Sequence, residues 1–475
     1  MSAVLDRPLP TSVPPRVTGR RILSPSWPVT ALFVGFPIWW ALGIAFLIVP
    51  LLAVPMTFSL LRRRNIVLPS GSGLWLLFTA WTLLGVLMLG KVAPGTQPGS
   101  FGERLLPFLS RSGTLIGASV LLIYIANLSP AQLPAMRFAR MLGFLFVVTV
   151  VGGVAGMLFP HGGFTSLAEY VLPHHLVSKG SYLRELIHPN FAQVQGFLGY
   201  ETPRPAAPFA YTNEWGANLS LLLPFFVLSW FAPGSQGGQR WRRWLAPPIL
   251  AVCAVVVIYS LNRGLWIAIA LSVAYIVMVM VLRGRIRIVQ MALAAALVGG
   301  VAFVATPLHT VVSERLAHGH SDTRRAYLAT AALQGATHSP FLGWGSTRKP
   351  YGNVSSIAAG ATPNCPRCAP PPIGTHGLIY LISFSHGFVG AGLMVAFFIG
   401  AFFRTRRDRR PFGIAATIVV GLVLVEMFFY QLIPFGLPIA TAVFAMAWRE
   451  RAAGRPVPAT GVPRSLPRTL TPDSQ

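Results

Sequence analysis

The residues of this chain best suited to chemistry are one histidine and a few arginines beside long apolar runs. His376 stands directly before an apolar stretch, and Arg263 lies between two such stretches in "IYSLNRGLWIAIA". Arg324 and Arg325 belong to a segment, 323–335, with the pattern of a short amphipathic helix. An ionisable group next to a membrane segment is costly and marks a functional site by default. These four residues are therefore the candidates.

These residue types fit transfer chemistry on a phosphorylated substrate. Guanidinium groups bind phosphate through two hydrogen bonds and keep their charge, and histidine takes a proton from a hydroxyl near neutral pH. A pyrophosphate whose charge is held leaves readily, so a sugar hydroxyl could attack a lipid-pyrophosphate-linked glycan without a metal. Structural roles are the alternatives: snorkelling for Arg263, a solvated end for the double arginine, and a helix cap for His376.

The composition is that of a polytopic membrane protein. Of 475 residues, 53% are hydrophobic and 11% are charged, and the mean hydropathy is +0.61. Runs of about 20 apolar residues, enough to cross a bilayer, recur along the chain and predict an all-α membrane fold with about 12 transmembrane helices. The expected spans are roughly 29–45, 46–61, 73–90, 107–127, 141–159, 213–231, 245–260, 263–282, 288–306, 377–403, 411–430 and 433–448.

The net charge of +26 indicates topology rather than nucleic-acid binding. Arginine-rich connectors alternate with weakly charged ones, so that all of the former fall on one side of the membrane. The positive-inside rule makes that side the cytoplasm, with both termini on it. The connectors are "RRR" (62–64), "RFAR" (137–140), "RWRR" (240–243), "RGRIR" (283–287), "RTRRDRR" (404–410) and "RER" (449–451).

One transmembrane domain, 29–451, is expected between two cytoplasmic tails. The tails, 1–28 and 452–475, are rich in proline and arginine and are predicted to be disordered, and no cleavable signal peptide is evident. Two outer loops are long, at about 160–212 and 307–376, and the larger is expected to carry short helices. Long loops on a rigid scaffold are where function concentrates.

The three cysteines predict one disulfide. Cys365 and Cys368 form "CPRC" in the second outer loop, where thiols tend to oxidise. We expect a disulfide that stiffens the approach to His376. A redox-active pair is the alternative, although no thioredoxin-like context surrounds it. Cys253 lies in a predicted span and is expected to pack.

The other histidines predict no further site. "HH" at 174–175 and "HGH" at 318–320 lack a third ligand at a suitable spacing, so no metal is expected. His386 lies ten residues after His376 and is expected to pack inside the bundle.

Four segments resemble motifs of the O-antigen ligase and O-antigen polymerase superfamily of bacterial membrane glycosyltransferases. The last of them has glycines eleven and fourteen positions after His376, as in that family. The likeness covers about 208–403. The segments are "PFAYTNEWGANLSLLLP" (208–224), similar to a phenylalanine-to-asparagine motif; "NRGLWIAIAL" (262–271), similar to a Ser-Arg-Gly motif; "RRAYLATAALQGATHSPFLGWG" (324–345), similar to an arginine, short-helix and Pro-Leu-Leu-Gly-x-Gly element; and "THGLIYLISFSHGFVGAGL" (375–393), similar to a His-Asn motif.

The resemblance implies a role for each candidate. Arg263 and Arg325 would hold the pyrophosphate of an undecaprenyl-type donor, and Arg324 could replace Arg325. His376 would be the general base that activates the acceptor hydroxyl, with inversion at the anomeric carbon and without a cofactor. The implied partners are an undecaprenyl-pyrophosphate-linked glycan, a glycan or cell-envelope acceptor and the lipid bilayer. The implied place is the outer face of the bacterial cytoplasmic membrane.

Some alternatives stay open at this level. Gly377 and Asn262 stand where the family has asparagine and serine, and the sequence does not separate a polymerase from a ligase. A secondary transporter or lipid flippase is the rival from another class. Glu426, inside a predicted span, would be its proton-relay candidate. We expect Glu426 instead to pair with an arginine or polar group across the bundle, and no internal repeat supports a transporter.

Overall fold

The computed structural model describes residues 24–173, 177, 182–195, 202–231, 240–285, 290, 300, 313, 320–350 and 372–453. Within these residues the protein is an all-α bundle of 15 α-helices with one small sheet. Five helices are long and apolar enough to cross a membrane. They are α5 (Phe101–Ala126), α6 (Ala135–Leu158), α10 (Arg240–Tyr259), α11 (Arg263–Leu282) and α15 (Leu378–Thr405).

The remaining elements are shorter or less apolar. The sheet is an antiparallel pair in which Ala192 lies opposite Pro205. The elements are α1 (Trp27–Phe33), α2 (Phe36–Ala41), η1 (Ala45–Leu47), α3 (Ile48–Leu61), α4 (Ser72–Leu84), η2 (Gly85–Met88), α7 (Leu167–Val171), α8 (Tyr182–Ile187), β1 (Ala192–Gln195), β2 (Thr202–Pro205), α9 (Thr212–Phe231), α14 (His320–His338), α16 (Pro411–Glu426) and α17 (Gly436–Ala453).

The described helices follow the expected spans, with one clear difference. The helix α11 begins at Arg263 and ends at Leu282, as expected for 263–282. The region 29–45 does not form one helix: α1 ends at Phe33, and a new helix, α2, begins after Gly35 with Pro37 in its first turn. The expected span 288–306 and both expected tails lie largely outside the described residues.

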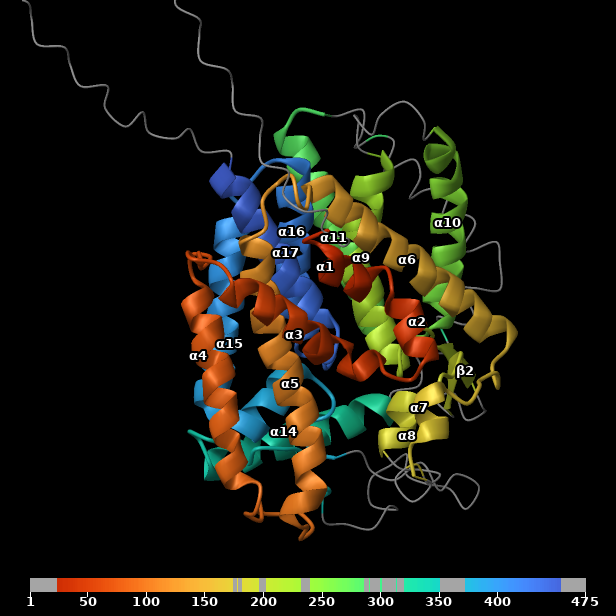
Figure 1. Cartoon of the computed structure of the whole chain (residues 1–475). Helices are drawn as coiled ribbons and strands as arrows, with labels where there is room; N and C mark the ends of the chain where they lie inside the picture. Colours follow the sequence, from red (N-terminus) through yellow and green to blue (C-terminus); the bar gives the residue numbers. More distant parts are fainter. Residues whose placement is uncertain are drawn as a thin grey trace, which may run out of the picture.

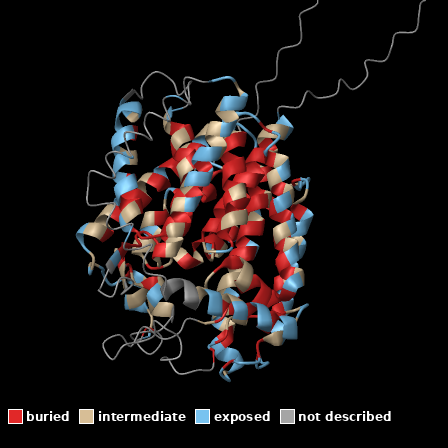
Figure 2. Ribbon diagram, turned by 180° about the vertical axis from the view of Figure 1, so that it is seen from behind, coloured by how far each residue is buried: buried red, intermediate tan, exposed pale blue. Residues whose placement is uncertain are grey.

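The outer surface of the bundle is apolar, as a lipid environment requires. The helix α5 packs between α3 and α17, and α6 packs on α9. Figure 2 shows buried residues along the central helices and exposed ones on the outward sides. On α11 only 17% of the apolar window is buried, and Leu282 is 77% exposed. A soluble monomer rarely leaves such a continuous apolar surface in water. The protein is therefore a candidate multi-span membrane protein.

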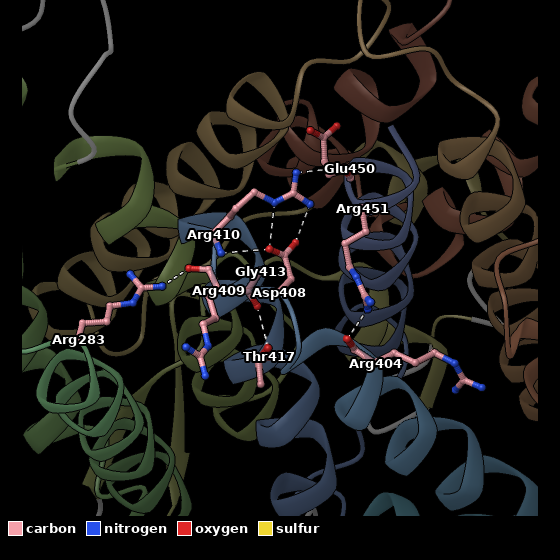
Figure 3. Close-up of polar contacts among 9 residues, drawn as sticks. All are labelled: Arg283, Arg404, Asp408, Arg409, Arg410, Gly413, Thr417, Glu450 and Arg451. Atoms are coloured by element: carbon pink, nitrogen blue, oxygen red, sulfur yellow. Dashed lines mark hydrogen bonds and ion pairs between the residues drawn. The ribbon is translucent and has the colours of Figure 1, made fainter. Parts of the chain in front are cut away.

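One end of the bundle, which we call the arginine end, gathers arginine-rich helix termini (Figure 3). Asp408 lies at its centre and accepts hydrogen bonds from the main-chain N–H and the guanidinium of Arg410 at 2.9–3.0 Å. Arginines at this end also donate to main-chain carbonyls: Arg283 to Arg409, Arg410 to Glu450 and Arg451 to Arg404.

Two further arginines lie at the same end. Arg63 donates to the carbonyl of Asn127, where α5 ends. Arg449, near the end of α17, donates to the carbonyls of Leu128 and Leu133 in the turn between α5 and α6. The structure therefore places arginines 62–64, the α5–α6 turn and residues 404–410 and 449–451 together, as the sequence predicts.

The described parts of the two long loops lie at the opposite end, which we call the loop end. The helices α7 and α8 and the small sheet lie there, and α14 runs across the bundle beside them (Figure 1). The turn between α2 and η1 joins them, because the N–H of Ala168 donates to the carbonyl of Leu42. Gly43, with φ +77°, lies against Ser166 and leaves no room for a Cβ.

Candidate functional site

Tyr430, in the turn between α16 and α17, is the residue at which the candidate segments meet. Its hydroxyl donates to Oδ1 of Asn262, the residue before Arg263. Its carbonyl accepts the N–H of Leu378, two residues after His376, at 2.7 Å. Arg325 on α14 acts electrostatically on the same side chain. We call the group formed by Tyr430, Asn262, Leu378, Arg325 and Arg204 the Tyr430 centre.

Two glycines let α9 and α11 close around this centre. A Cβ at Gly264 would lie 2.7 Å from the hydroxyl oxygen of Tyr430. A Cβ at Gly216 on α9 would lie 2.5 Å from Nδ2 of Asn262. Asn262 is 3% exposed, so its hydrogen bond to Tyr430 is made away from water. Asn262 thus has a defined partner, and Arg263 follows as the first, half-buried residue of α11.

The segment that carries His376 is fixed against the α16–α17 turn. The N–H groups of Leu378 and Ile379 donate to the carbonyls of Tyr430 and Met427. Gly377 has φ +156°, and a Cβ there would lie 2.9 Å from the carbonyl oxygen of Phe428. A glycine at this position therefore allows the chain directly after half-buried His376 to approach the α16–α17 turn closely.

A break in α15 holds α14, and with it Arg325, in place. Gly387 interrupts α15 with φ +71°, and the loop after α14 fills the break. The N–H groups of Trp344 and Gly345 donate to the carbonyls of Phe384 and Ser385 at 2.9 and 2.7 Å. Broken helices persist in membranes where neighbouring backbone satisfies the freed groups. Gly387, the glycine eleven positions after His376, therefore has a structural purpose.

Arg204 is a member of the centre that sequence reasoning does not single out. It is 4% exposed, and its Nε donates to the carbonyl of Ser260 at 2.7 Å. Its charge acts on Tyr430 together with that of Arg325. The available signal was an arginine between two prolines in "TPRP", shortly before the 208–224 motif.

Glu426 pairs with a polar group across the bundle, one of the two kinds of partner expected. Its Oε1 accepts from the hydroxyl of Ser220 on α9. Glu426 is 1% exposed, and within the described residues its Oε2 has no hydrogen-bond partner. It is also the carboxylate that acts electrostatically on Tyr430.

A second set of buried arginines ties the loop end together. Arg348 is 2% exposed and donates to the carbonyls of Trp344 and Ser346 at 2.7 and 2.9 Å. Burial, followed by the charge of Arg104, lowers the pKa of Arg348 to about 10. Arg104 itself donates to the carbonyl of Leu89 at 2.8 Å. These guanidinium groups bind backbone rather than carboxylates.

Other predicted residues lie apart from the centre or outside the described residues. His386 is 5% exposed beside Gly85 on η2, as expected for packing, and Cys253 is a buried free thiol. Arg324 belongs to α14, but its side chain is not described. Cys365, Cys368, His174, His175 and His318 lie outside the described residues.

An open apolar recess lies at the loop end, with about 340 Å³ of empty space that includes open solvent. Its lining includes Phe435, five residues after Tyr430 in the chain, together with Trp40 and Phe209. Glu214, near the start of α9, is the one carboxylate among the lining residues. Among the described residues, no three histidine, cysteine or acidic side chains lie close enough together to hold a metal ion.

Comparison of the sequence with models of protein families finds no match, and comparison with curated proteins finds no relative.

Proposed function

We propose that this protein is a membrane glycosyltransferase of the ligase or polymerase type. It transfers a glycan from an undecaprenyl-pyrophosphate donor to an acceptor hydroxyl, without a metal and with inversion. The observation that carries the proposal is the meeting of Asn262–Arg263, Arg325 and the His376–Leu378 segment at Tyr430. These segments are far apart in the sequence, and each carries one of the groups that the reaction needs.

The reaction uses these groups in one displacement. His376 takes the proton of the acceptor hydroxyl while its oxygen attacks the anomeric carbon from the face opposite the pyrophosphate. The bond between that carbon and the pyrophosphate oxygen breaks, and the electron pair leaves with the pyrophosphate. Arg263 and Arg325 hold the charge that develops there, and fixed cations aimed at such charge are the largest catalytic factor in many enzymes. Arg204 supports their positive field from a buried position.

The proposal includes a membrane topology. The proposed topology has about 12 spans. The arginine end lies in the cytoplasm and the loop end on the outer face of a bacterial cytoplasmic membrane, because arginine-rich connectors are retained inside. The two ends lie on opposite sides of the bundle (Figure 1). The Tyr430 centre is at the loop end, where lipid-linked glycans and their acceptors would meet it.

The test is glycan transfer by the purified protein in detergent. The donor is an undecaprenyl-pyrophosphate oligosaccharide, without added metal, and His376→Ala and Arg263→Ala are compared with wild type. Arg283→Ala at the arginine end is the matched control, because it removes a guanidinium far from the centre. We expect wild type and the control to be active and the two site variants to lose about 100-fold or more of the rate.

Each outcome of this assay has a meaning. Longer lipid-linked chains made from the donor alone identify a polymerase, and transfer only to a separately supplied acceptor identifies a ligase. Site variants as active as wild type would place the chemistry elsewhere. A protein inactive with every acceptor that moves lipid-linked substrate across proteoliposomes would be a transporter. Glu426, with one carboxylate oxygen bonded to Ser220 and the other unpartnered among the described residues, would then be the first residue to test.

A further inference from the structure

The hydrogen bonds of Thr375 fix where the proton of His376 lies. The Thr375 hydroxyl lies 2.7 Å from the carbonyl oxygen of Pro372 and 3.2 Å from Nδ1 of His376. A carbonyl can only accept, so the single hydroxyl proton goes to Pro372. Towards His376 the hydroxyl then offers only a lone pair. The hydrogen bond between them therefore requires a proton on Nδ1.

We infer that Thr375 is a positioning residue that holds neutral His376 in the tautomer with its proton on Nδ1 and its lone pair on Nε2. This inference rests on the proposed function, in which His376 is the base, and it names the atom that does the work. In a neutral imidazole, the nitrogen that carries no proton is the one that accepts. Nε2 is thus the atom that receives the acceptor's proton.

The chain around Thr375 is built to keep this geometry. The N–H of Ile373 donates to the carbonyl of Arg348 at 2.7 Å, and Ile373 is 4% exposed. Gly374 has φ +90°, a conformation that favours glycine, and the N–H of Thr375 returns to the carbonyl of Pro372 at 3.3 Å. A tight turn therefore precedes His376, while the bonds to Tyr430 and Met427 follow it.

The same hydrogen bond serves both states of the base. When Nε2 takes the hydroxyl proton, the new bond joins the acceptor oxygen to the anomeric carbon and the pyrophosphate leaves with the electron pair. His376 is then an imidazolium with protons on both nitrogens. Nδ1–H still donates to Thr375, now from a charged donor, and such bonds are stronger. The proton on Nε2 is afterwards released to water, which restores the starting tautomer.

The first test is the pair Thr375→Val and Thr375→Ser, assayed beside His376→Ala. Valine has nearly the shape of threonine but no hydroxyl, and serine keeps it. We expect Thr375→Val to lower kcat about tenfold, the value of one lost hydrogen bond, while KM stays within about twofold. Thr375→Ser should restore most of kcat. Thr337→Val is the control, because among the described residues that exposed hydroxyl bonds only within α14, to the carbonyl of Gln334, at 2.7 Å.

The second measurement is independent of activity. The ¹⁵N chemical shifts of histidine-labelled protein, with the signals of His376 identified by their loss in His376→Gln, report which ring nitrogen carries the proton. We expect protonated Nδ1 in wild type and a shift towards protonated Nε2 in Thr375→Val. Protonated Nε2 in wild type would overturn the inference. So would a fully active Thr375→Val beside an inactive His376→Ala, which would leave the proposed function intact. An active His376→Ala would instead overturn the function itself.

Discussion

The two ends of the bundle use the same residue type in opposite ways. At the arginine end most of the described guanidinium groups are at the surface: the Arg410 side chain is 50% exposed, and Arg407 and Arg409 are exposed. Arg449, which is 5% exposed against the α5–α6 turn, is the exception. At the loop end, Arg204 and Arg348 are 4% and 2% exposed. The first group is open to the surroundings of the protein, and the second lies inside it.

This difference separates topology from chemistry. An exposed guanidinium costs little and contributes little to stability, so under the proposed topology the arginine end would serve only to orient the protein in the membrane. A buried one loses its hydration, and the protein must supply hydrogen bonds in return. The described arginines therefore fall into two groups, and only the buried or half-buried ones at the loop end are expected to affect catalysis.

The largest expected effect is on catalysis, from Arg325→Ala. Arg325 acts on Tyr430, and its loss removes one of the cations proposed to hold the leaving group. We expect kcat to fall about 100- to 1,000-fold, measured by glycan transfer. Arg409→Ala at the arginine end should change the rate less than twofold, because the carbonyl of Arg409, not its side chain, holds Arg283.

Arg324→Ala sharpens the same comparison within α14. Arg324 and Arg325 are adjacent, and sequence alone leaves open which one contacts the substrate. We expect Arg324→Ala to keep more than about a third of the wild-type rate. Loss of a cation that holds the leaving group should instead lower the rate about 100-fold. The reverse result, with Arg324→Ala inactive and Arg325→Ala active, would exchange their roles in the proposed mechanism.

The next effect is on stability, from Arg348→Met. Methionine keeps the length of the side chain but leaves the carbonyls of Trp344 and Ser346 without their donor. Each buried acceptor left unsatisfied costs about 1–3 kcal/mol, so we expect a loss of about 3 kcal/mol in the free energy of unfolding. Urea unfolding in detergent measures it. Exposed Arg407→Met should stay within about 0.5 kcal/mol of wild type, and equal effects of the two variants would contradict the comparison.

The sequence predicts those features that depend on local patterns and misses those that depend on contacts between distant segments. Helix positions and the gathering of arginines at one end were predictable because they depend on local patterns: apolar runs and charged connectors. The bounds of α11 and the pairing of Glu426 with a polar group are examples. The role of Arg204 was not predictable, because its burial comes from β2 packing next to Ser260, 56 residues away in the chain. Thr375 was missed for a related reason, since its effect depends on the turn that Gly374 allows.

A smaller effect is expected where a carboxylate organises the arginine end. Burial acts to raise the pKa of Asp408, but the hydrogen bonds and charge of Arg410 outweigh it and hold the pKa below its ordinary value. Asp408→Asn keeps the shape but weakens these bonds, and we expect it to cost about 1–2 kcal/mol of unfolding free energy without changing kcat. Glu450→Gln is the control, because Glu450 is a 25% exposed partner of Arg449. It should cost less than about 1 kcal/mol of unfolding free energy.

The smallest effect is a pH dependence at the loop end, outside the Tyr430 centre. Glu169 accepts from Arg184 Nε at 3.0 Å and lies 2.5 Å from His188 Nδ1. Burial acts to raise the pKa of Glu169, but these partners outweigh it and hold the pKa below 4.5. A lowered carboxylate pKa means that the stabilisation is complete above the unfolded value of 4.5 and is lost as the pH falls through the folded value.

Hydrogen exchange of residues 182–187 as a function of pH measures this effect. We expect wild-type protection of α8 to be constant between about pH 6 and 7 and to fall below about pH 4, where the carboxylate takes up a proton. Glu169→Gln should lose protection already at neutral pH and show no further loss on acidification. Glu185→Gln, which removes the charge of the Tyr211 partner but keeps an oxygen that can accept from its hydroxyl, should keep the acid-dependent loss, because the Glu169 pair remains. An acid response that persists in Glu169→Gln would assign it to another group. The buried arginines would then stabilise the loop end without a contribution from Glu169.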